Sequence, residues 1–395
     1  MLENPDLLRL VLSSPDDDGP RLVYADWLGD QGEDERAEFI TTQCEIARHE
    51  REFDKPSATL LGRETILRKG NKEIWVENVD GLVRRAFLER GFVERVWPTP
   101  NFDDLREACR RAPIRWLELG ELGDEDIEQI AASGIVDEIG GARFPMLASD
   151  ERLAMWFDLA TSRVSRLRWL SLPESRLSTI GIERLRAVPW QRLEHLDLGR
   201  GASDPGAVGA MLASPTFASL RRLDVSTAFG HPSQSDRMAL ALASASSLGT
   251  LEDLALGTDL GDAGMSALCA TPFRALRRLD IGKAKLTGEG FHALVAAPFL
   301  DGLRALILGD PSGIYRPRSI GQSELFSFLG SSRLTALRML DLSGLLIEDE
   351  GAEILCGSPH LRNLRSLVLR SCDIGPAMQR TLRKRFGVGV CSFGG

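Results

Sequence analysis

A short aliphatic phrase recurs along most of this 395-residue chain: a leucine, two residues, a second leucine, one residue and a further aliphatic residue. It begins at eight positions that lie 25 to 34 residues apart, namely Leu167, Leu193, Leu220, Leu251, Leu276, Leu303, Leu337 and Leu364. Self-similarity at this period is typical of repeat proteins, in which each unit buries its apolar face only against its neighbours. The spacing therefore predicts a solenoid, whose main feature is an extended surface.

Each repeat combines a strand with a helix. The last two aliphatic residues of the phrase are two positions apart, so they point to one face of a short strand. A polar turn follows, and then a stretch such as LTGEGFHALVAAPF, which has apolar residues at helical spacing and a stop that contains proline. We expect strand, turn, helix and return in every unit, with parallel strands side by side and the bulkier helices on the outside of a curved sheet.

These features resemble leucine-rich repeats of the ribonuclease-inhibitor-like subtype. The resemblance implies an α/β solenoid shaped as a horseshoe, with a parallel sheet on the concave face and helices on the convex face. Weaker units extend the array toward the N-terminus: IRWLEL from Ile114 fits the phrase, GIVDEI around Val136 fits loosely, and the segment with Val93 and Val96 suits a capping strand.

The first 90 residues differ from the repeats. Helical periodicity is present in residues 5–12, 20–28 and 34–48. Two apolar stripes are expected to face a small core, one of Leu22, Val23, Trp27 and Leu28 and one of Phe39, Ile40 and Ile46. Residues 16–40, which contain the elements YADWL and RAEFI, resemble the companion domain found ahead of repeat arrays in planctomycete proteins. This resemblance implies a bacterial chain and no transferable catalytic activity.

Four segments are expected. They are a helical companion head at 1–50, a helical linker and N-terminal cap at 51–90, leucine-rich repeats at 91–375 and a C-terminal cap at 376–395. The cap contains a basic helix followed by a short strand from Val388.

Composition restricts the class of function. The formal net charge of −9 disfavours a general nucleic-acid binder. No run of about 18 apolar residues is present, and the acidic N-terminus lacks the layout of a secretory signal, so we expect neither membrane insertion nor export. The six cysteines lack CxxC spacing, which favours reduced thiols. A monomeric protein of the cytoplasm is the expected context.

A search for catalytic motifs finds none. The loop Asp16–Asp18 lacks the spaced oxygen ligands of a calcium loop, so a turn before a helix is the favoured interpretation. Tyr24, Asp26 and Trp27 fit internal packing better than a site. The five histidines are isolated, and metalloprotease, hydrolase and phosphate-loop motifs are missing. We expect no catalytic residue, no metal ligand and no cofactor, and an enzyme or regulator with a site in the head is kept as an alternative.

Strand alternation predicts which side chains face the concave surface. The residues flanking the second leucine form two columns, and the candidate partner-binding residues are Trp116, Glu118, Trp169, Ser171, His195, Asp197, Arg222, Asp224, Asp253, Arg278, Asp280, Ile307, Met339 and Asp341. The two tryptophans are either anchors of a protein-binding patch or core residues covered by an N-terminal loop. The carboxylates either attract a basic partner or are neutralised by the arginines beside them.

Arginine recurs just after the first leucine of the phrase, at Arg115, Arg168, Arg221, Arg277, Arg304, Arg338 and Arg365. Such an edge could grip phosphates or an acidic protein, but pairing with acids of the adjoining loops is the favoured interpretation. An insertion after one strand adds Tyr315, Arg316 and Arg318 as candidate contacts. The sequence therefore predicts a non-enzymatic scaffold that binds another protein through its concave face and inserted loops. Anion or nucleic-acid binding along the arginine edge is a further alternative.

Overall fold

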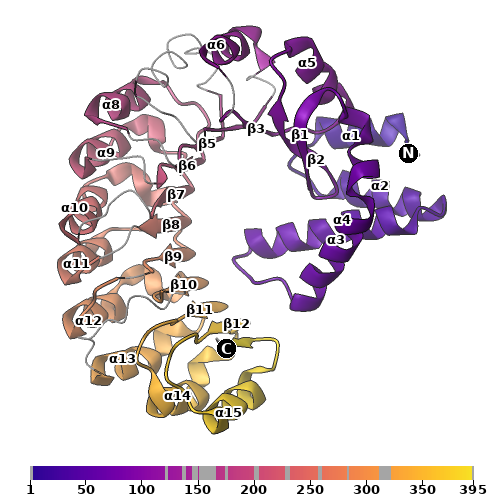
Figure 1. Cartoon of the computed structure of the whole chain (residues 1–395). Helices are drawn as coiled ribbons and strands as arrows, with labels where there is room; N and C mark the ends of the chain where they lie inside the picture. Colours follow the sequence, from indigo (N-terminus) through magenta and orange to yellow (C-terminus); the bar gives the residue numbers. More distant parts are fainter. Residues whose placement is uncertain are drawn as a thin grey trace. The chain divides into compact units, whose positions relative to one another are not determined.

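The computed structural model describes residues 3–120, 123–135, 139–144, 150, 166–173, 177–199, 204–226, 232–256, 260–282, 284–310 and 322–393 (Figure 1). Contacts divide the chain into two compact units. Unit 1 comprises Met1–Glu52, Pro56–Pro145 and Met155–Leu170, and unit 2 comprises Phe53–Lys55, Met146–Ala154 and Ser171–Gly395. In the sheet, neighbouring strands follow chain order.

Unit 1 begins with helices. They are α1 (Pro5–Ser13), α2 (Gly19–Asp30), α3 (Asp34–Arg51), α4 (Ala58–Trp75) and the 3-10 turn η1 (Glu77–Val79). The side chain of Asn4 caps α1 by accepting hydrogen bonds from the backbone N–H of Asp6 and Leu7, and Ser57 caps α4 in the same way. Such caps satisfy donors that have no partner inside the helix.

The buried face of α2 differs from the predicted stripe. Leu22 and Val23 are 38% and 50% exposed, whereas Arg21, Tyr24 and Leu28 are buried. The predicted stripe was therefore wrong at Leu22 and Val23 and is confirmed at Leu28. The stripe of the third segment is confirmed at Phe39 and Ile40, which are fully buried.

The strands of unit 1 form the start of the sheet. An antiparallel hairpin of β1 (Val83–Glu89) and β2 (Phe92–Pro98) leads to β3 (Trp116–Glu118) and β4 (Gly141–Arg143), which continue from β2 in parallel. Helices α5 (Phe102–Arg111) and α6 (Asp124–Ser133) connect them, and β5 (Trp169–Ser171) begins in this unit. The predicted capping strand is β2. The weak unit expected around Val136 lies outside the described residues, and the strand that pairs next to β3 is β4.

Unit 2 repeats one strand and one helix. Its strands are β6 (His195–Asp197), β7 (Arg222–Val225), β8 (Asp253–Leu256), β9 (Arg278–Asp280), β10 (Ala305–Ile307), β11 (Met339–Asp341), β12 (Ser366–Val368) and β13 (Cys391–Ser392). Its helices are α8 (Thr179–Ala187), α9 (Pro205–Leu212), α10 (Pro232–Ala243), α11 (Asp262–Ala270), α12 (Gly288–Ala296), α13 (Gln322–Leu329), α14 (Glu348–Gly357) and α15 (Pro376–Phe386). Short 3-10 turns η4 (Pro215–Phe217), η5 (Ser246–Thr250), η6 (Pro298–Gly302), η7 (Ser332–Leu334) and η8 (Pro359–Leu361) return the chain to the next strand.

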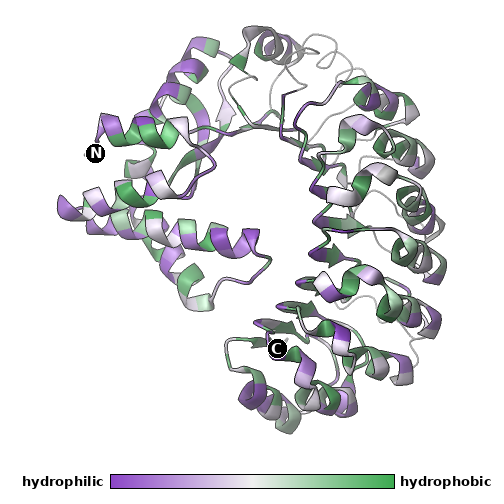
Figure 2. Ribbon diagram, turned by 180° about the vertical axis from the view of Figure 1, so that it is seen from behind, coloured by the Kyte–Doolittle hydropathy of each residue, from purple (hydrophilic) through white to green (hydrophobic). Residues whose placement is uncertain are grey.

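The repeated aliphatic residues form the core of unit 2. Leu220, Leu223 and Val225 of one phrase are at most 1% exposed, and burying such a side chain contributes about 1.5–3 kcal/mol. Strands β6 to β12 line the inner side of an arc and the helices lie along its outer side (Figure 1). Each helix carries both hydrophobic and hydrophilic residues, as expected when only one face packs on a core (Figure 2).

Aspartates also link successive helices of unit 2. Asp236 of α10 accepts hydrogen bonds from the N–H groups of Gly261 and Gly264 at the start of α11. Asp262 of α11 bonds Thr287 and Gly290 at the start of α12 in the same way. A Cβ on Gly290 would lie 2.4 Å from the Asp262 carboxylate, so this glycine leaves room for the acid. A carboxylate at a helix N-terminus is also favoured by the helix dipole.

Candidate functional site

The two predicted columns of side chains are aligned by the parallel register of unit 2. His195, Arg222, Asp253, Arg278, Ala305, Met339 and Ser366 pair in sequence along the first column, and Asp197, Asp224, Ala255, Asp280, Ile307, Asp341 and Val368 along the second. The second leucine of each phrase lies between the columns and is buried. The strand face is therefore an ordered grid of mainly polar side chains.

The candidate residues differ in accessibility. Those that are half-buried are Trp116, His195, Asp197, Arg222, Asp224, Asp253, Arg278, Asp280, Ile307 and Met339. The remaining four, Glu118, Trp169, Ser171 and Asp341, are between 4% and 8% exposed. These four residues are therefore less accessible than the other candidates, because neighbouring side chains cover them.

Arg278 neutralises the middle of the acidic column. Its guanidinium donates to Asp253 at 2.9 Å and to Asp280 at 2.8 Å. Burial raises the pKa of Asp280, although Arg278 and the backbone N–H of Gly282 oppose this rise. Burial lowers the pKa of Arg278, but the nearby carboxylates of Asp253 and Asp280 have a larger opposite effect. The pKa of Arg278 is therefore raised. The acids here form a paired cluster instead of an open negative stripe.

Other side chains contact the same grid. The hydroxyl of Ser171 donates to the carboxylate of Asp197 at 2.7 Å, and not to an imidazole as a serine nucleophile would. Within unit 2, the ring centroid of Phe53 lies 5.7 Å from the guanidinium carbon of Arg222. Arg222 therefore has an aromatic contact as well as its place in the first column.

The tryptophans Trp116 and Trp169 form one stack within unit 1. Their ring centroids are 5.2 Å apart and the planes differ by 21°. The guanidinium carbons of Arg115 and Arg168 lie 4.4 and 4.8 Å from the Trp169 ring, and both arginines pair with the carboxylate of Asp16. Of the two interpretations left open by the sequence, the contact made by the loop at Asp16 and the 7% exposure of Trp169 favour a covered core.

The arginine edge is largely satisfied by the protein itself. Arg115 and Arg168 bind Asp16, Arg221 pairs with Glu252, and Arg277 donates to the carbonyl of Gly302 at 3.0 Å. Within unit 2, Arg365 lies 3.6 Å from Asp54. These contacts favour internal pairing, so the edge offers few free guanidinium groups for phosphate.

Unit 1 contains a buried ionic cluster that was not predicted from the sequence. Glu94 accepts hydrogen bonds from Arg21 and Arg90, and all three side chains are at most 6% exposed. Desolvation lowers the pKa of Arg21, although Glu94 opposes this effect. Charged residues are rarely buried unless they are paired, so nothing in the sequence singled out Arg21 and Glu94 as core residues. The only available signal was the helical spacing of Arg21 to Tyr24, Ala25 and Leu28.

The candidate residues of the inserted loop cannot be placed, and the described residues show neither a metal site nor a membrane-spanning helix. Tyr315, Arg316 and Arg318 lie outside the described residues. In the part of the chain that the structure describes, no three His, Cys, Asp or Glu side chains gather as metal ligands would. None of the helices in those ranges combines the length and apolarity needed to cross a membrane.

The comparisons with known proteins concern the fold. No family model matches this chain, and no curated protein matches it. The chain aligns over 99% of its length with 95% of a chain in the crystal structure of the yeast Rad7 and Elc1 complex, at 14% identity and a TM-score of 0.54. An internalin, InlF of Listeria monocytogenes, aligns with 81% of this chain and 94% of its own, at 15% identity and a TM-score of 0.38. The repeated strands and helices, together with the alignment to the chain of the Rad7 and Elc1 complex, fit an α/β leucine-rich-repeat solenoid.

Proposed function

We propose that this chain is a non-enzymatic scaffold that binds another protein through the strand face of unit 2. The observation that carries the proposal is the in-register grid, in which half-buried polar and apolar side chains stand on adjacent parallel strands. A rigid sheet presents such side chains without further ordering, which lowers the entropic cost of binding. The similar Rad7 chain was crystallised in a complex with Elc1, which agrees with this class of role.

The grid suits a partner of mixed character. Asp253, Arg278 and Asp280 offer paired charges, whereas Ile307 and Met339 add partly exposed apolar surface on the next two strands. Apolar contacts favour affinity, and charged groups at the rim favour selectivity and the rate of association. The inserted loop with Tyr315, Arg316 and Arg318 belongs to the same proposal.

We further propose the finer assignments. The alternation of a strand with a full helix supports the ribonuclease-inhibitor-like subtype, and Tyr24 and Arg36 in the helical core support a planctomycete-type companion head. The helices up to Arg51 support a head at 1–50, with the linker and cap at 51–90, the repeats at 91–375 and the C-terminal cap at 376–395. The free cysteines suit the reducing cytoplasm of a bacterial cell, and the expected state is a monomer.

Site-specific photocrosslinking tests the binding face. A benzoylphenylalanine at Ile307 or Met339 of the full chain, expressed in its native host, should give a discrete adduct with one protein. The same group at Ile180 or Leu240, which are 68% and 52% exposed on helices, is the matched control and should give none. Arg222→Glu should reduce the adduct at least tenfold, while Arg186→Glu on α8 should not. Equal adducts from both faces, or adducts insensitive to Arg222→Glu, would contradict the proposal.

A further inference from the structure

Arg36 is a buried arginine that has no acidic partner among the described residues. It lies on α3, is 6% exposed and donates through Nη2 to the carbonyl of Gly91. Its other terminal nitrogen, Nη1, is buried and has no hydrogen-bond partner among the described residues. The guanidinium carbon lies 4.9 Å from the ring centroid of Trp75 and 5.7 Å from that of Phe92. Aromatic faces stabilise a cation, but they do not accept the hydrogen bond of Nη1.

The neighbouring buried arginines differ from Arg36 in this respect. Arg21 and Arg90 share the buried carboxylate of Glu94. No carboxylate of the described residues forms an ion pair with Arg36, and burial lowers its pKa to about 9. An unpaired buried charge is costly, and a protein keeps one chiefly where something else completes the pair. Among the described residues, Arg21 and Arg90 each contact a carboxylate, whereas the carboxylate of Glu3, which lines the same pocket as Arg36, forms no ion pair with it.

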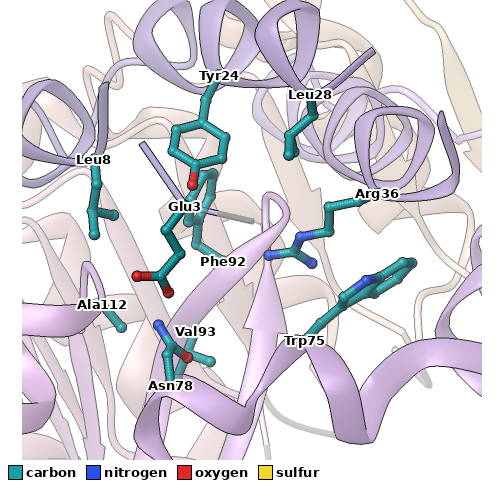
Figure 3. A pocket seen from close by; sticks show the side chains of 10 residues that line it. All are labelled: Glu3, Leu8, Tyr24, Leu28, Arg36, Trp75, Asn78, Phe92, Val93 and Ala112. Carbon is teal, nitrogen blue, oxygen red and sulfur yellow. The ribbon is translucent and has the colours of Figure 1, made fainter. Parts of the chain in front are cut away.

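The free nitrogen of Arg36 faces a pocket of unit 1. Figure 3 shows the guanidinium pointing into a space bordered by Tyr24, Phe92 and Trp75, with Glu3 and Asn78 toward the other side. The enclosed cavity is about 20 Å³. About 10–15 Å³ by this measure holds one water molecule, so the space admits one oxygen atom of a carboxylate while the rest of the group lies toward the opening. Tyr24 and Leu28 of the YADWL element and Arg36 of the RAEFI element line this pocket, and the proposed binding at the strand face does not involve them.

We propose that this pocket of the helical head binds a carboxylate group, with Arg36 Nη1 as the donor and the rings of Trp75 and Phe92 as walls. The group can come from a small monocarboxylic acid or from the C-terminal carboxylate of a peptide, whose chain would leave through the mouth. A tetrahedral dianion such as sulfate has four oxygens and is too large for the enclosed space. The proposal concerns unit 1 and is independent of binding at the strand face.

Ligand titrations of the full chain test this proposal. Acetate, a tetrapeptide with a free C-terminus and the same peptide as its C-terminal amide are titrated at constant ionic strength, with chloride as the balancing anion and sulfate as a further probe. Ligand-observed NMR and calorimetry measure binding. Saturable binding of acetate identifies a small acid as a sufficient ligand, and binding of the free-acid peptide alone identifies a chain terminus. The amide and sulfate should not bind.

Three variants distinguish a loss of binding at Arg36 from a loss of folding of the head. Arg36→Met should weaken binding at least tenfold, while Arg63→Met on the exposed face of α4 is the matched control and should leave it unchanged. Because Arg36→Met could unfold the head, Leu8→Trp is the second variant: it fills the pocket without touching Arg36 and should also abolish binding. The proposal is overturned if neither acetate nor the free-acid peptide binds, if the amide binds equally well, or if binding persists in Leu8→Trp.

Discussion

The indole rings of Trp116 and Trp169 stack at 5.2 Å although a whole repeat lies between them in the sequence. The strand between them, β4, allows the two rings to stack because it begins with Gly141, which has no side chain. A Cβ on Gly141 would lie 2.8 Å from the Trp116 ring, and a Cβ on Gly140 would lie 2.5 Å from the Trp169 ring. The degenerate repeat is therefore an adaptation to the two large rings that pack over it.

Gly141→Ala should destabilise unit 1 by about 1–3 kcal/mol, since the added methyl group must displace a ring that is held on both sides. Gly62→Ala is the control, because no atom lies within 4 Å of its new Cβ on α4. It should be neutral or stabilise by about 0.5–1 kcal/mol. Urea unfolding followed by tryptophan fluorescence measures both. Equal free energies of unfolding for the two variants would show that the glycine is not needed for the stack.

Glu94→Gln should cost about 3–5 kcal/mol, because it keeps the shape of the side chain but removes the carboxylate that two buried guanidinium groups share, while Arg90 keeps its ion pair with Asp18. Arg21 and Arg90 approach Glu94 at 2.6 and 2.8 Å. Glu107→Gln provides the comparison, since Glu107 pairs with Arg111 at the surface, where solvent screens the pair and its loss should cost little. A loss at Glu94 no larger than at Glu107, measured by chemical denaturation, would argue against a central role for this cluster.

The periodic part of the chain could be predicted well from the sequence. Arg222 and Asp224 were assigned to one face of a strand from two leucines alone, and β7 places them there. Two-residue alternation leaves no other arrangement once Leu223 is buried. In unit 1 this logic failed at α2, where a buried Arg21 replaces an apolar residue, and at β4, where glycines replace the aliphatic phrase. Both exceptions depend on partners distant in sequence, Glu94 and Trp116, which a local pattern cannot reveal.

The turn Asp16–Asp18 also makes contacts with residues distant in sequence, which a local pattern could not predict. Asp16 was predicted to be part of a plain turn before a helix, and Asp17 does accept a hydrogen bond from the N–H of Gly19. Its neighbour Asp16, however, bridges Arg115 and Arg168, which are 99 and 152 residues away. Residue spacing cannot reveal that Asp16 bridges these two arginines beside the Trp169 ring. For this reason the sequence left open whether the tryptophans are exposed anchors or covered core residues.

Asp262→Ala should lower the free energy of unfolding of unit 2 by about 0.5–2 kcal/mol, the range for loss of a helix cap. Its carboxylate bonds the N–H groups of Thr287 and Gly290 at 2.8 and 3.0 Å. Glu289→Ala removes an exposed acid from the first turn of the same helix and should change stability by less than about 0.5 kcal/mol. Gly290→Ala should be costly alone and less costly beside Asp262→Ala, and strict additivity in this double-mutant cycle would refute the contact.

Stability should fall as the pH rises above about 8.5, because the buried thiols resist ionisation in the folded state. Burial raises the pKa of Cys44 and Cys372 to about 12. Above pH 8.5 the unfolded chain releases these protons while the folded chain keeps them, so each thiol favours unfolding by about 1–2 kcal/mol at pH 10. Urea denaturation in reducing buffer at pH 7, 8.5 and 10 measures the trend. Cys372→Ala should lose stability at pH 7 through its smaller side chain but show a shallower decline between pH 8.5 and 10. Parallel declines in the two proteins would mean that Cys372 ionises as readily in the folded chain as in the unfolded one.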